Sequence, residues 1–139
     1  MVKFRDIAVL ESLFKRNPLI PITEAEPPKI HMNVGSTSVN SDNLFTVEIE
    51  LRCDLLKGDK RIVESQVKVA GIFELVGDNI EGLSVDTFQK VNAPAILYPF
   101  VREHLANLSI KAGMNPLIIP TVNFQKMAEG KANDTNKID

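Results

Sequence analysis

Alternating apolar and polar residues in the middle of the chain constrain the fold more than any other feature. Every second residue from Phe45 to Cys53 is apolar, and Thr, Glu, Glu and Arg stand between them. A two-residue period turns one set of side chains toward a core and the other toward water, as in an antiparallel strand that is covered on one face. The sequence therefore predicts a sheet with one buried and one solvated face.

Two further runs predict strands beside this one. Residues 30–34 alternate in the same way, and residues 35–42 between the two runs are rich in turn formers. Residues 62–75 continue the pattern after a turn at 57–60. Gly71 stands alone in this third run and indicates a bulge or a close approach of another part of the chain. Three consecutive strands with such connections predict a meander.

The segment 4–14 favours a different secondary structure by its pattern alone. Phe4, Ile7 and Leu10 recur every three residues, and Leu13 and Phe14 follow. That spacing is typical of a helix. Four prolines then enforce an extended, irregular connection, at Pro18, Pro21, Pro27 and Pro28.

The main helix is predicted to begin at Asn92. This residue type caps helices, and Pro94 follows in the first turn, where its missing N–H does no harm. An apolar stripe occupies residues 96–108, and Gly113 predicts the C-terminal stop. Pro99 lies inside the span and predicts a kink.

The segments on either side of this helix complete the order of elements. Asp86 is expected to cap a short turn over residues 87–90. After the helix, residues 116–122 are apolar, contain two prolines and predict an extended crossover, and Asn123 then caps a short helix over residues 124–129. Strands first and helices last favour an α+β fold, with helices on one face of an antiparallel sheet.

Composition excludes several classes of function. The 139 residues fit one domain, residues 1–129, with a disordered polar tail over residues 130–139. Sixteen basic and eighteen acidic residues leave a net charge of −2, so nucleic acid is not an expected partner. Cys53 is the only cysteine, which excludes an intrachain disulfide and a CxxC metal site. No signal peptide or membrane-length apolar run is found, so we expect a cytoplasmic protein without membrane insertion.

No catalytic constellation is found, and we predict no enzymatic activity, no cofactor and no metal site. Cys53 is in phase with the buried residues of its strand, so we interpret it as a small hydrophobe and not as a nucleophile beside His31 or His104. His31 alternates onto the exposed side of its strand, and His104 lies on or beside the polar face of the main helix. Glu48 and Glu50 share a strand face without a partner motif and are interpreted as a solvated surface.

Residues 117–124 are more apolar than a short connection needs. They either pack over the helix as core, or they line a groove or a subunit interface. The pattern alone leaves both interpretations open.

Three linked motifs resemble those of the SecB export chaperones. Residues 96–103 read as an apolar pair, Tyr, Pro, Phe, Val and Arg-Glu, which resembles the helix signature of that family. Residues 120–124, Pro-Thr-Val-Asn-Phe, are similar to the end of its crossover with one extra residue, and residues 70–73, Ala-Gly-Ile-Phe, are similar to the end of its third strand. The order and spacing of these motifs across residues 29–124 make the resemblance specific.

The resemblance implies a four-stranded antiparallel sheet with a long helix packed on one face, assembled as a homotetramer, a dimer of dimers. It implies that residues 4–14 form the first strand, against their helical spacing, and we adopt that prediction. It also implies an ATP-independent holdase that binds unfolded preproteins on apolar grooves, for protein export or for delivery to a dedicated partner. Such grooves beside strand edges accept extended chains with little sequence preference.

Apolar residues near a sheet edge and near the crossover are expected to line that groove. Methionine suits such a surface because its side chain adapts to many partners. The expected groove residues are Met32, Phe45, Val67, Val69, Ile118, Ile119, Phe124 and Met127.

A second surface expected from the resemblance is an acidic face that docks the translocase motor ATPase. The matching positions are Glu11, Lys15 and Gln66. Two of the three acidic groups are therefore missing: Gln66 is neutral, and Lys15 carries the opposite charge. Lost pairing and new repulsion should weaken docking. Two alternatives stay open: a SecB-like chaperone dedicated to an antitoxin of a toxin–antitoxin system, and, in a different class, a small-ligand-binding or scaffold domain.

Overall fold

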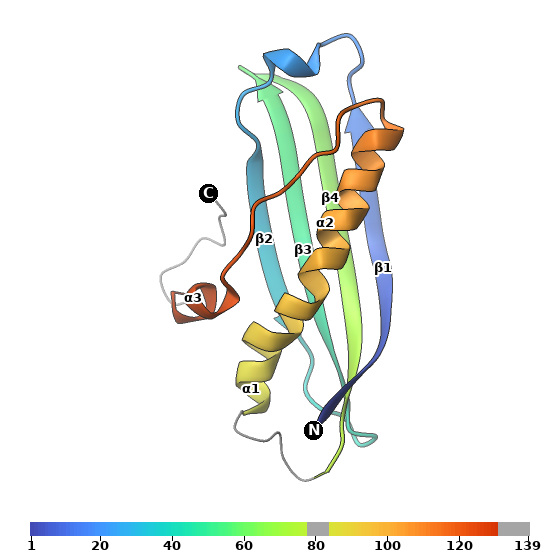
Figure 1. The fold of residues 1–139 in the computed structure, drawn as a ribbon, viewed down its shortest axis with the longest axis vertical. Coiled ribbons are helices and arrows are strands. Elements are labelled where there is room, and N and C mark those ends of the chain that lie inside the picture. Colours follow the sequence, from blue (N-terminus) through green and yellow to red (C-terminus); the bar gives the residue numbers. More distant parts are fainter. Residues whose placement is uncertain (78–83, 131–139) are drawn as a thin grey trace.

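A four-stranded antiparallel sheet forms the body of the molecule (Figure 1). The computed structural model describes residues 1–77 and 84–130. The strand order is β1-β4-β3-β2, so the first strand of the chain pairs with the last. The strands are β1 (Val2–Arg16), β2 (Lys29–Ser36), β3 (Leu44–Lys57) and β4 (Lys60–Leu75). The predicted α+β fold and the three-stranded meander are confirmed.

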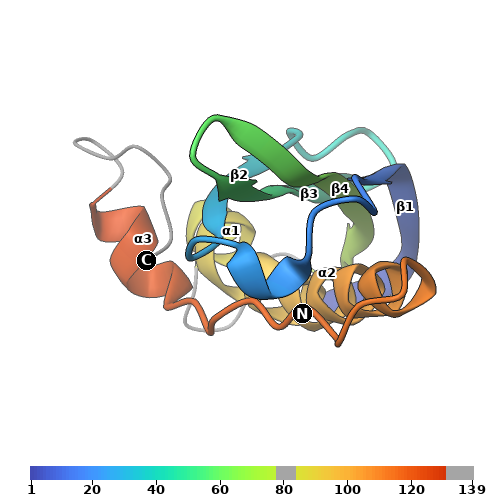
Figure 2. The same cartoon turned by 90° about the horizontal axis from the view of Figure 1, so that it is seen from above.

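The helices gather on one face of this sheet, as the view from above shows (Figure 2). The long helix, α2, contacts the two central strands, β3 and β4. It continues a short helical start without a break in the chain direction, whereas the last helix lies beyond an extended segment (Figure 1). The helical elements are η1 (Ile22–Glu24), α1 (Val85–Thr87), the π turn η2 (Phe88–Asn92), α2 (Ala93–Lys111) and α3 (Phe124–Glu129).

Two irregularities in β1 explain why its sequence spacing imitates a helix. The register with β4 shifts between Phe4 and Asp6 and again between Val9 and Glu11. Each bulge inserts one extra residue into the two-residue alternation. On the side of β1 that faces α2, the apolar residues are therefore spaced first by three positions and then by two. Leu10 lies within the second register shift and is 50% exposed. The strand implied by the family resemblance is confirmed, and the helix favoured by spacing alone is wrong.

The hydrophobic core lies between α2 and the covered face of β3 and β4. Alternate residues of β3 are fully buried there, and their neighbours are only partly exposed on the other face. Cys53 belongs to the buried set, and burial raises the pKa of its thiol to about 12. A thiol that stays protonated and inaccessible packs as a small hydrophobe, as predicted. The side chains with at most 1% exposure in this core include Val47, Ile49, Leu51, Val67, Val69, Phe73, Leu97, Val101 and Leu105.

Gly71 allows α2 to approach the sheet closely. A Cβ atom at this position would lie 2.7 Å from Leu97 Cδ2 and 2.9 Å from Phe73 Cε2. Both neighbours are fully buried, so neither can move aside without disturbing the core. The close approach predicted from the isolated glycine is confirmed.

Substituting Gly71→Ala is therefore expected to lower the free energy of unfolding by about 1–3 kcal/mol, the usual cost of overpacking a core. Gly35→Ala is the matched control, because a Cβ on Gly35 meets nothing within 4 Å. Urea denaturation of both variants measures the difference. Equal stability of the two variants would contradict a close helix–sheet contact at Gly71.

The start of the helical segment differs from the prediction. Asn92 has helical dihedral angles and makes no capping hydrogen bond, so it is not the N-cap. The cap is Ser84, whose side chain accepts a hydrogen bond from the Thr87 amide at 3.0 Å. Asp86, predicted as a cap, instead lies in the first turn and pairs with Lys90 at 3.0 Å. The π turn before α2 explains the error. Pro94 has no N–H to donate, and the wider turn allows the helix to continue through the residues before it.

The end of α2 and the last helix follow the prediction. Gly113 has a φ of +82°, the left-handed conformation that ends helices. Asn123 Oδ1 accepts a hydrogen bond from the Lys126 amide at 2.9 Å and caps α3. Of the tail predicted to be disordered, residues 131–139 lie outside the described residues.

Candidate functional site

The eight predicted groove residues divide into a buried and an accessible set. Six have at most 5% exposure, because α2 and the crossover cover the sheet face on which most of them lie. In the part of the chain that is described, these six side chains form core and offer no surface to a ligand. Ile118 is 66% exposed and Met127 is partly exposed, so the prediction of a groove remains for these two. The six buried residues are Met32, Phe45, Val67, Val69, Ile119 and Phe124.

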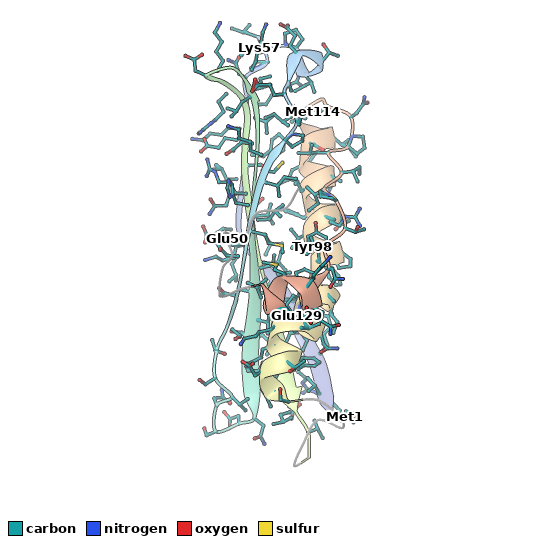
Figure 3. The ribbon with its side chains drawn as sticks, turned by 90° about the vertical axis from the view of Figure 1, so that its left-hand side faces the viewer. Met1, Glu50, Lys57, Tyr98, Met114 and Glu129 are labelled. Carbon is teal, nitrogen blue, oxygen red and sulfur yellow. The ribbon has the colours of Figure 1, made fainter. Side chains whose placement is uncertain are left out.

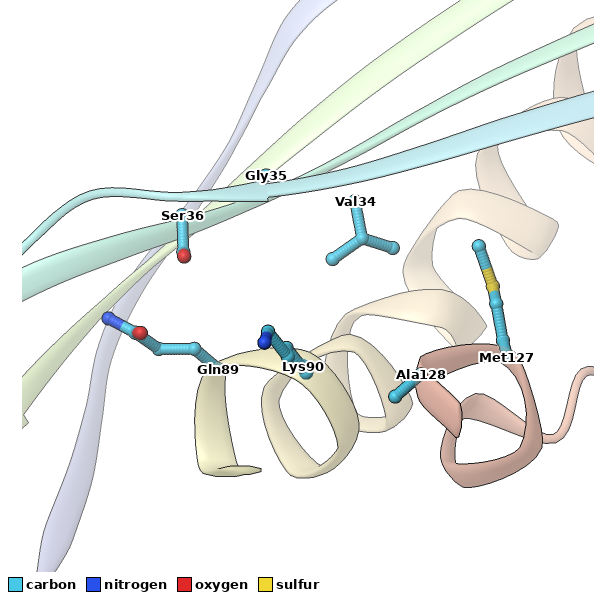
Figure 4. Close-up of a pocket in the computed structure, with 7 residues that line it drawn as sticks. All are labelled: Val34, Gly35, Ser36, Gln89, Lys90, Met127 and Ala128. Atoms are coloured by element: carbon cyan, nitrogen blue, oxygen red, sulfur yellow. The ribbon is translucent and has the colours of Figure 1, made fainter. Parts of the chain in front are cut away.

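A hollow of about 280 Å³ opens beside Met127, between the edge of β2 and two helical segments (Figure 4). Strand β2 supplies one wall, the π turn η2 supplies the floor, and α3 supplies the other wall. The lining residues are Val34, Gly35, Ser36, Gln89, Lys90, Met127 and Ala128.

The hollow combines apolar side chains with exposed backbone. Gly35 leaves the space beside β2 open, since nothing lies within 4 Å of where its Cβ would be. Val34 and Met127 supply apolar contact from opposite walls (Figure 4). Because β2 pairs with β3 alone among the described strands, its outer edge lies along this hollow. An extended chain with an apolar side chain fits such a site.

Two polar residues at the floor of the hollow are already engaged. Gln89 donates a hydrogen bond from Nε2 to the Thr37 carbonyl at 2.9 Å and closes the β2 end. Lys90 is paired with Asp86, which neutralises its charge. The sequence placed both residues in a short turn over residues 87–90 but did not join that turn to the main helix, because it put the helix start at Asn92. Ser84, three residues before Thr87, is the signal that would have placed the helix start ahead of both.

The crossover between α2 and α3 divides its apolar residues between core and surface. Ile119 is 1% exposed, whereas its neighbour Ile118 is 66% exposed. The Tyr98 hydroxyl donates a hydrogen bond to the Pro120 carbonyl, and burial raises the pKa of Tyr98 to about 12, so the donor stays protonated at neutral pH. The core interpretation therefore applies to Ile119, and the groove or interface interpretation stays a prediction for Ile118.

The three expected docking residues lie on the sheet face away from α2. Figure 3 shows this face edge-on, with Glu50 on one side of the sheet and Tyr98 on the other. Glu11 forms an ion pair with Lys68 at 3.1 Å, and Lys68 also lies 3.5 Å from Glu50. The hydrogen bond and the charge of Glu11 raise the pKa of Lys68. The one acidic residue among the three expected docking positions is thus already paired with a cation of the same chain.

A second cluster on this face centres on Arg52. Its guanidinium lies 2.8 Å from Glu64 and 3.0 Å from Asp54, and it donates a longer hydrogen bond of 3.4 Å to Gln66. The hydrogen bond from Arg52 lowers the pKa of Glu64. Lys15 is the register partner of Glu64 across β1 and β4. The three expected docking positions thus lie in or beside two clusters of opposite charges on this face.

The lowered pKa of Glu64 predicts an acid-sensitive contribution to folding. A carboxyl group whose pKa is lower in the folded chain stabilises the fold at neutral pH, and this stabilisation disappears as the pH falls through the folded pKa. Glu64→Gln should therefore flatten the fall of unfolding free energy between about pH 5 and pH 3. Glu48→Gln is the control on the same face of the sheet, because Glu48 makes no ion pair within 4.0 Å with any described residue and adds only a more distant charge near Lys68. Urea titrations at each pH measure both, and parallel curves for the wild type and Glu64→Gln would contradict the assignment.

The described residues contain no candidate metal site and no candidate membrane span. No three His, Cys, Asp or Glu side chains there are grouped to hold a metal ion. His104 instead shares a hydrogen bond of 2.9 Å with Ser12, which joins α2 to β1. No helix in the described ranges is long and apolar enough to cross a membrane.

Comparisons with known proteins agree with this geometry. The family described as "Preprotein translocase subunit SecB" matches residues 12–134. A protein-export protein SecB of Orientia tsutsugamushi (strain Ikeda) is 29% identical over 121 residues, which cover 87% of this chain and 73% of the relative. The protein-export protein SecB of Rickettsia felis is 25% identical over 130 residues, which cover 90% of this chain and 84% of the relative.

A solved structure shares the fold. It is a SecB-like chaperone of Mycobacterium tuberculosis in complex with an antitoxin peptide, with a TM-score of 0.73 and 14% sequence identity over 88% of this chain and 91% of that one. The family match spans most of the sequence, and the sheet and helix agree with the family's architecture. The chain therefore belongs to the SecB family, whose members are export chaperones and not enzymes.

Proposed function

We propose that this chain is an ATP-independent, cytoplasmic holdase that binds extended segments of unfolded preproteins. The observation that carries the proposal is the hollow of about 280 Å³ between the outer edge of β2 and Met127 of α3. The relatives that are named protein-export proteins support the same function.

The chemistry of the hollow favours extended, apolar clients. A client strand beside β2 pairs its backbone with the strand edge, and one of its side chains enters between Val34 and Met127. The flexible thioether of Met127 adapts to side chains of different shape. Burying one large apolar side chain contributes about 1.5–3 kcal/mol, so a single hollow binds weakly. Tight capture therefore needs several hollows acting on one client.

Assembly into a homo-oligomer supplies those repeated sites. The outward face of α2 carries Ile96, Phe100 and Ile110, which are 38%, 43% and 53% exposed. The edge strand β1 carries Phe4 and Val9, 40% and 48% exposed. Exposed apolar patches of this kind are typical of protein interfaces. Phe4 and Phe100 make an edge-to-face contact with ring centroids 6.4 Å apart, so the two sets of residues join into one apolar patch. Association through this patch gives a dimer, and we propose that two such dimers join, as the family resemblance implies.

The tetramer proposal predicts that a charge on the α2 face interrupts assembly. Ile110→Asp should halve the particle mass measured by light scattering, because a buried carboxylate without a partner is strongly unfavourable in an interface. Leu19→Asp is the control, since Leu19 is 89% exposed in a loop. A wild-type chain that scatters as a 15.4 kDa monomer would contradict the proposal.

The client-binding proposal predicts weaker capture when the walls of the hollow become polar. The double variant Val34→Thr/Met127→Gln should bind an unfolded, slow-folding client about tenfold more weakly, which corresponds to a loss of about 1.4 kcal/mol of apolar contact. Titration of a labelled client, followed by fluorescence anisotropy, gives the dissociation constants.

Leu19→Gln provides the control, because it removes an exposed apolar side chain that does not line the hollow. An equal loss of client affinity in the double variant and in Leu19→Gln would indicate nonspecific surface binding. A wild-type chain that fails to suppress client aggregation at stoichiometric amounts would contradict the holdase, and a small molecule bound in a closed pocket would instead support the ligand-binding alternative.

The paired charges on the outer sheet face support a modified delivery route. Glu11 must leave Lys68 before it can pair with a basic partner, and Lys15 and Gln66 offer no acidic group. We therefore infer weak docking of the translocase motor ATPase, and a dedicated client such as an antitoxin is the second candidate. Calorimetric titration with the motor ATPase tests this, and submicromolar binding would favour ordinary export.

A further inference from the structure

The connection from β1 to η1 crosses one end of the molecule (Figure 1). At this end β1, β3 and α2 finish, and β2 and β4 begin. Arg16 Nη1 donates a hydrogen bond of 2.6 Å to the Ala112 carbonyl and ties the end of β1 to the end of α2. Figure 3 shows Lys57 and Met114 at the same end. We call this region the loop end and define it as residues 15–29, 52–64 and 108–116.

Charge is distributed unevenly between the loop end and the rest of the chain. The loop end has eight basic and five acidic residues, whereas the rest of the sequence has eight basic and thirteen acidic residues. The loop end is therefore positive in a chain that is negative as a whole. A chain polarised in this way orients itself toward a negatively charged partner.

Several cations of the loop end are not held by local carboxylates. Glu24 pairs with Lys57, and Glu64 pairs with both Arg52 and Arg61, so these acids are already engaged. The lysines of the loop end that make no ion pair with a described residue are Lys15, Lys29, Lys60 and Lys111. All four lysines are exposed, and their charges are available to an anionic partner.

One large apolar side chain projects from the loop end into solvent. Leu19 is 89% exposed, the highest value among the large apolar side chains of the described chain. Its neighbours Ile20 and Ile22 pack against a small core cluster, so the turn is held down on both sides of Leu19. Pro18 and Pro21 restrict the backbone of the same turn. Leu19 is therefore presented by a supported turn and not by a loose loop.

The backbone beneath Leu19 separates it from an ordinary exposed leucine. The two prolines of the turn have no N–H group. The Asn17 amide donates to the Ile62 carbonyl at 2.8 Å, the Leu19 amide donates to Asn17 Oδ1 at 3.0 Å, and the Ile20 amide makes a longer bond of 3.5 Å to the Asn17 carbonyl. Residues 17–21 thus have no N–H group without an acceptor. An apolar medium requires this, because it offers no partner to a free N–H group.

These features together fit an anionic lipid surface better than an acidic protein. Lysines near a membrane attract anionic headgroups, and an aliphatic side chain enters the boundary between headgroups and acyl chains. A peptide that adds to a strand edge needs free N–H groups, which the turn does not offer. The apolar side chain also projects outward, so it matches a soft lipid surface without a preformed pocket.

We propose that the loop end docks this chain on an anionic lipid surface, with Leu19 seated among the headgroups and the surrounding lysines next to lipid phosphates. The contact is peripheral and reversible. It goes beyond client binding and is independent of it, because neither Leu19 nor any loop-end lysine lines the β2 hollow. An assembly that presents several loop ends to one membrane binds more tightly than a single chain.

Sedimentation with vesicles tests the docking without any client. Vesicles of equimolar phosphatidylcholine and phosphatidylglycerol should sediment the chain at low salt and release it as salt is raised, and vesicles of phosphatidylcholine alone should not bind it. Leu19→Gln should lower the partition coefficient about tenfold. Ile118→Gln is the control, because Ile118 is 66% exposed but lies outside the loop end. An equal loss in both variants would overturn the assignment to Leu19.

Two matched pairs of lysines test the charge of the loop end. Lys29→Gln/Lys60→Gln should lower the partition coefficient by about tenfold or more, because each lysine near the membrane contributes to binding. Lys3→Gln/Lys126→Gln changes the net charge by the same amount outside the loop end, at two exposed lysines, and should leave binding nearly unchanged. An equal loss in both double variants would show that net charge alone drives binding and would overturn docking through the loop end.

Tryptophan fluorescence tests the position of the turn directly, because the chain has no tryptophan of its own. The emission of Leu19→Trp should shift to the blue on the anionic vesicles and be quenched by brominated acyl chains, whereas Ile118→Trp should show neither change. Sedimentation without quenching at position 19 would overturn the seating of Leu19. Failure to bind the vesicles, with lysine-dependent binding to polyglutamate, would assign the loop end to an acidic polypeptide and overturn lipid docking.

Discussion

The contact of α2 with the centre of the sheet determines where every other surface of this molecule lies. Leu97 reaches the backbone of β4 at Gly71, where no side chain intervenes. Val101 and Leu105 then follow along the same buried helix face. Because the helix covers the central strands β3 and β4, both edge strands are left beside it. The β2 edge forms the hollow with α3, and the β1 edge presents its apolar side chains to solvent.

The opposite face of the sheet has a different physical character. Lys68 lies between Glu11 and Glu50, and Arg52 lies between Asp54 and Glu64. Exposed ion pairs contribute about 0–1 kcal/mol each, so their main effect is to neutralise the surface and not to stabilise it. A surface neutralised in this way provides little electrostatic steering to a charged partner. The two faces therefore suit different interactions, apolar contacts around the helix and weak polar ones opposite it.

The sequence predicted the order of the elements well because the signals are local. Alternation identified β3, Asn123 identified the start of α3, and Gly113 identified the end of α2. The β1 strand was obtained from family resemblance only, because its two bulges are set by pairing with β4, which no local pattern reveals. The helix start was misplaced because a π turn carries the helix through Asn92.

The candidate site was less predictable for a general reason. Alternation shows that Phe45 and Val69 point to one face of the sheet, but it does not show what covers that face. In the structure α2 covers it, and these side chains are core. Gln89 and Ala128 line the hollow because two segments distant in sequence meet there, and neither residue type indicates a binding site by itself.

The pairing of β1 with β4 also has a consequence for how the chain folds. Val9 pairs with Val69, whereas β3 and β4 are joined by a tight turn at Gly58, which has a φ of +61°. The short hairpin closes a small loop, but docking β1 closes a long one and carries a larger entropic cost. During synthesis β1 leaves the ribosome first and waits without a partner until β4 has been made. Until then its long apolar edge needs the same protection from aggregation that the proposed holdase activity gives to other chains.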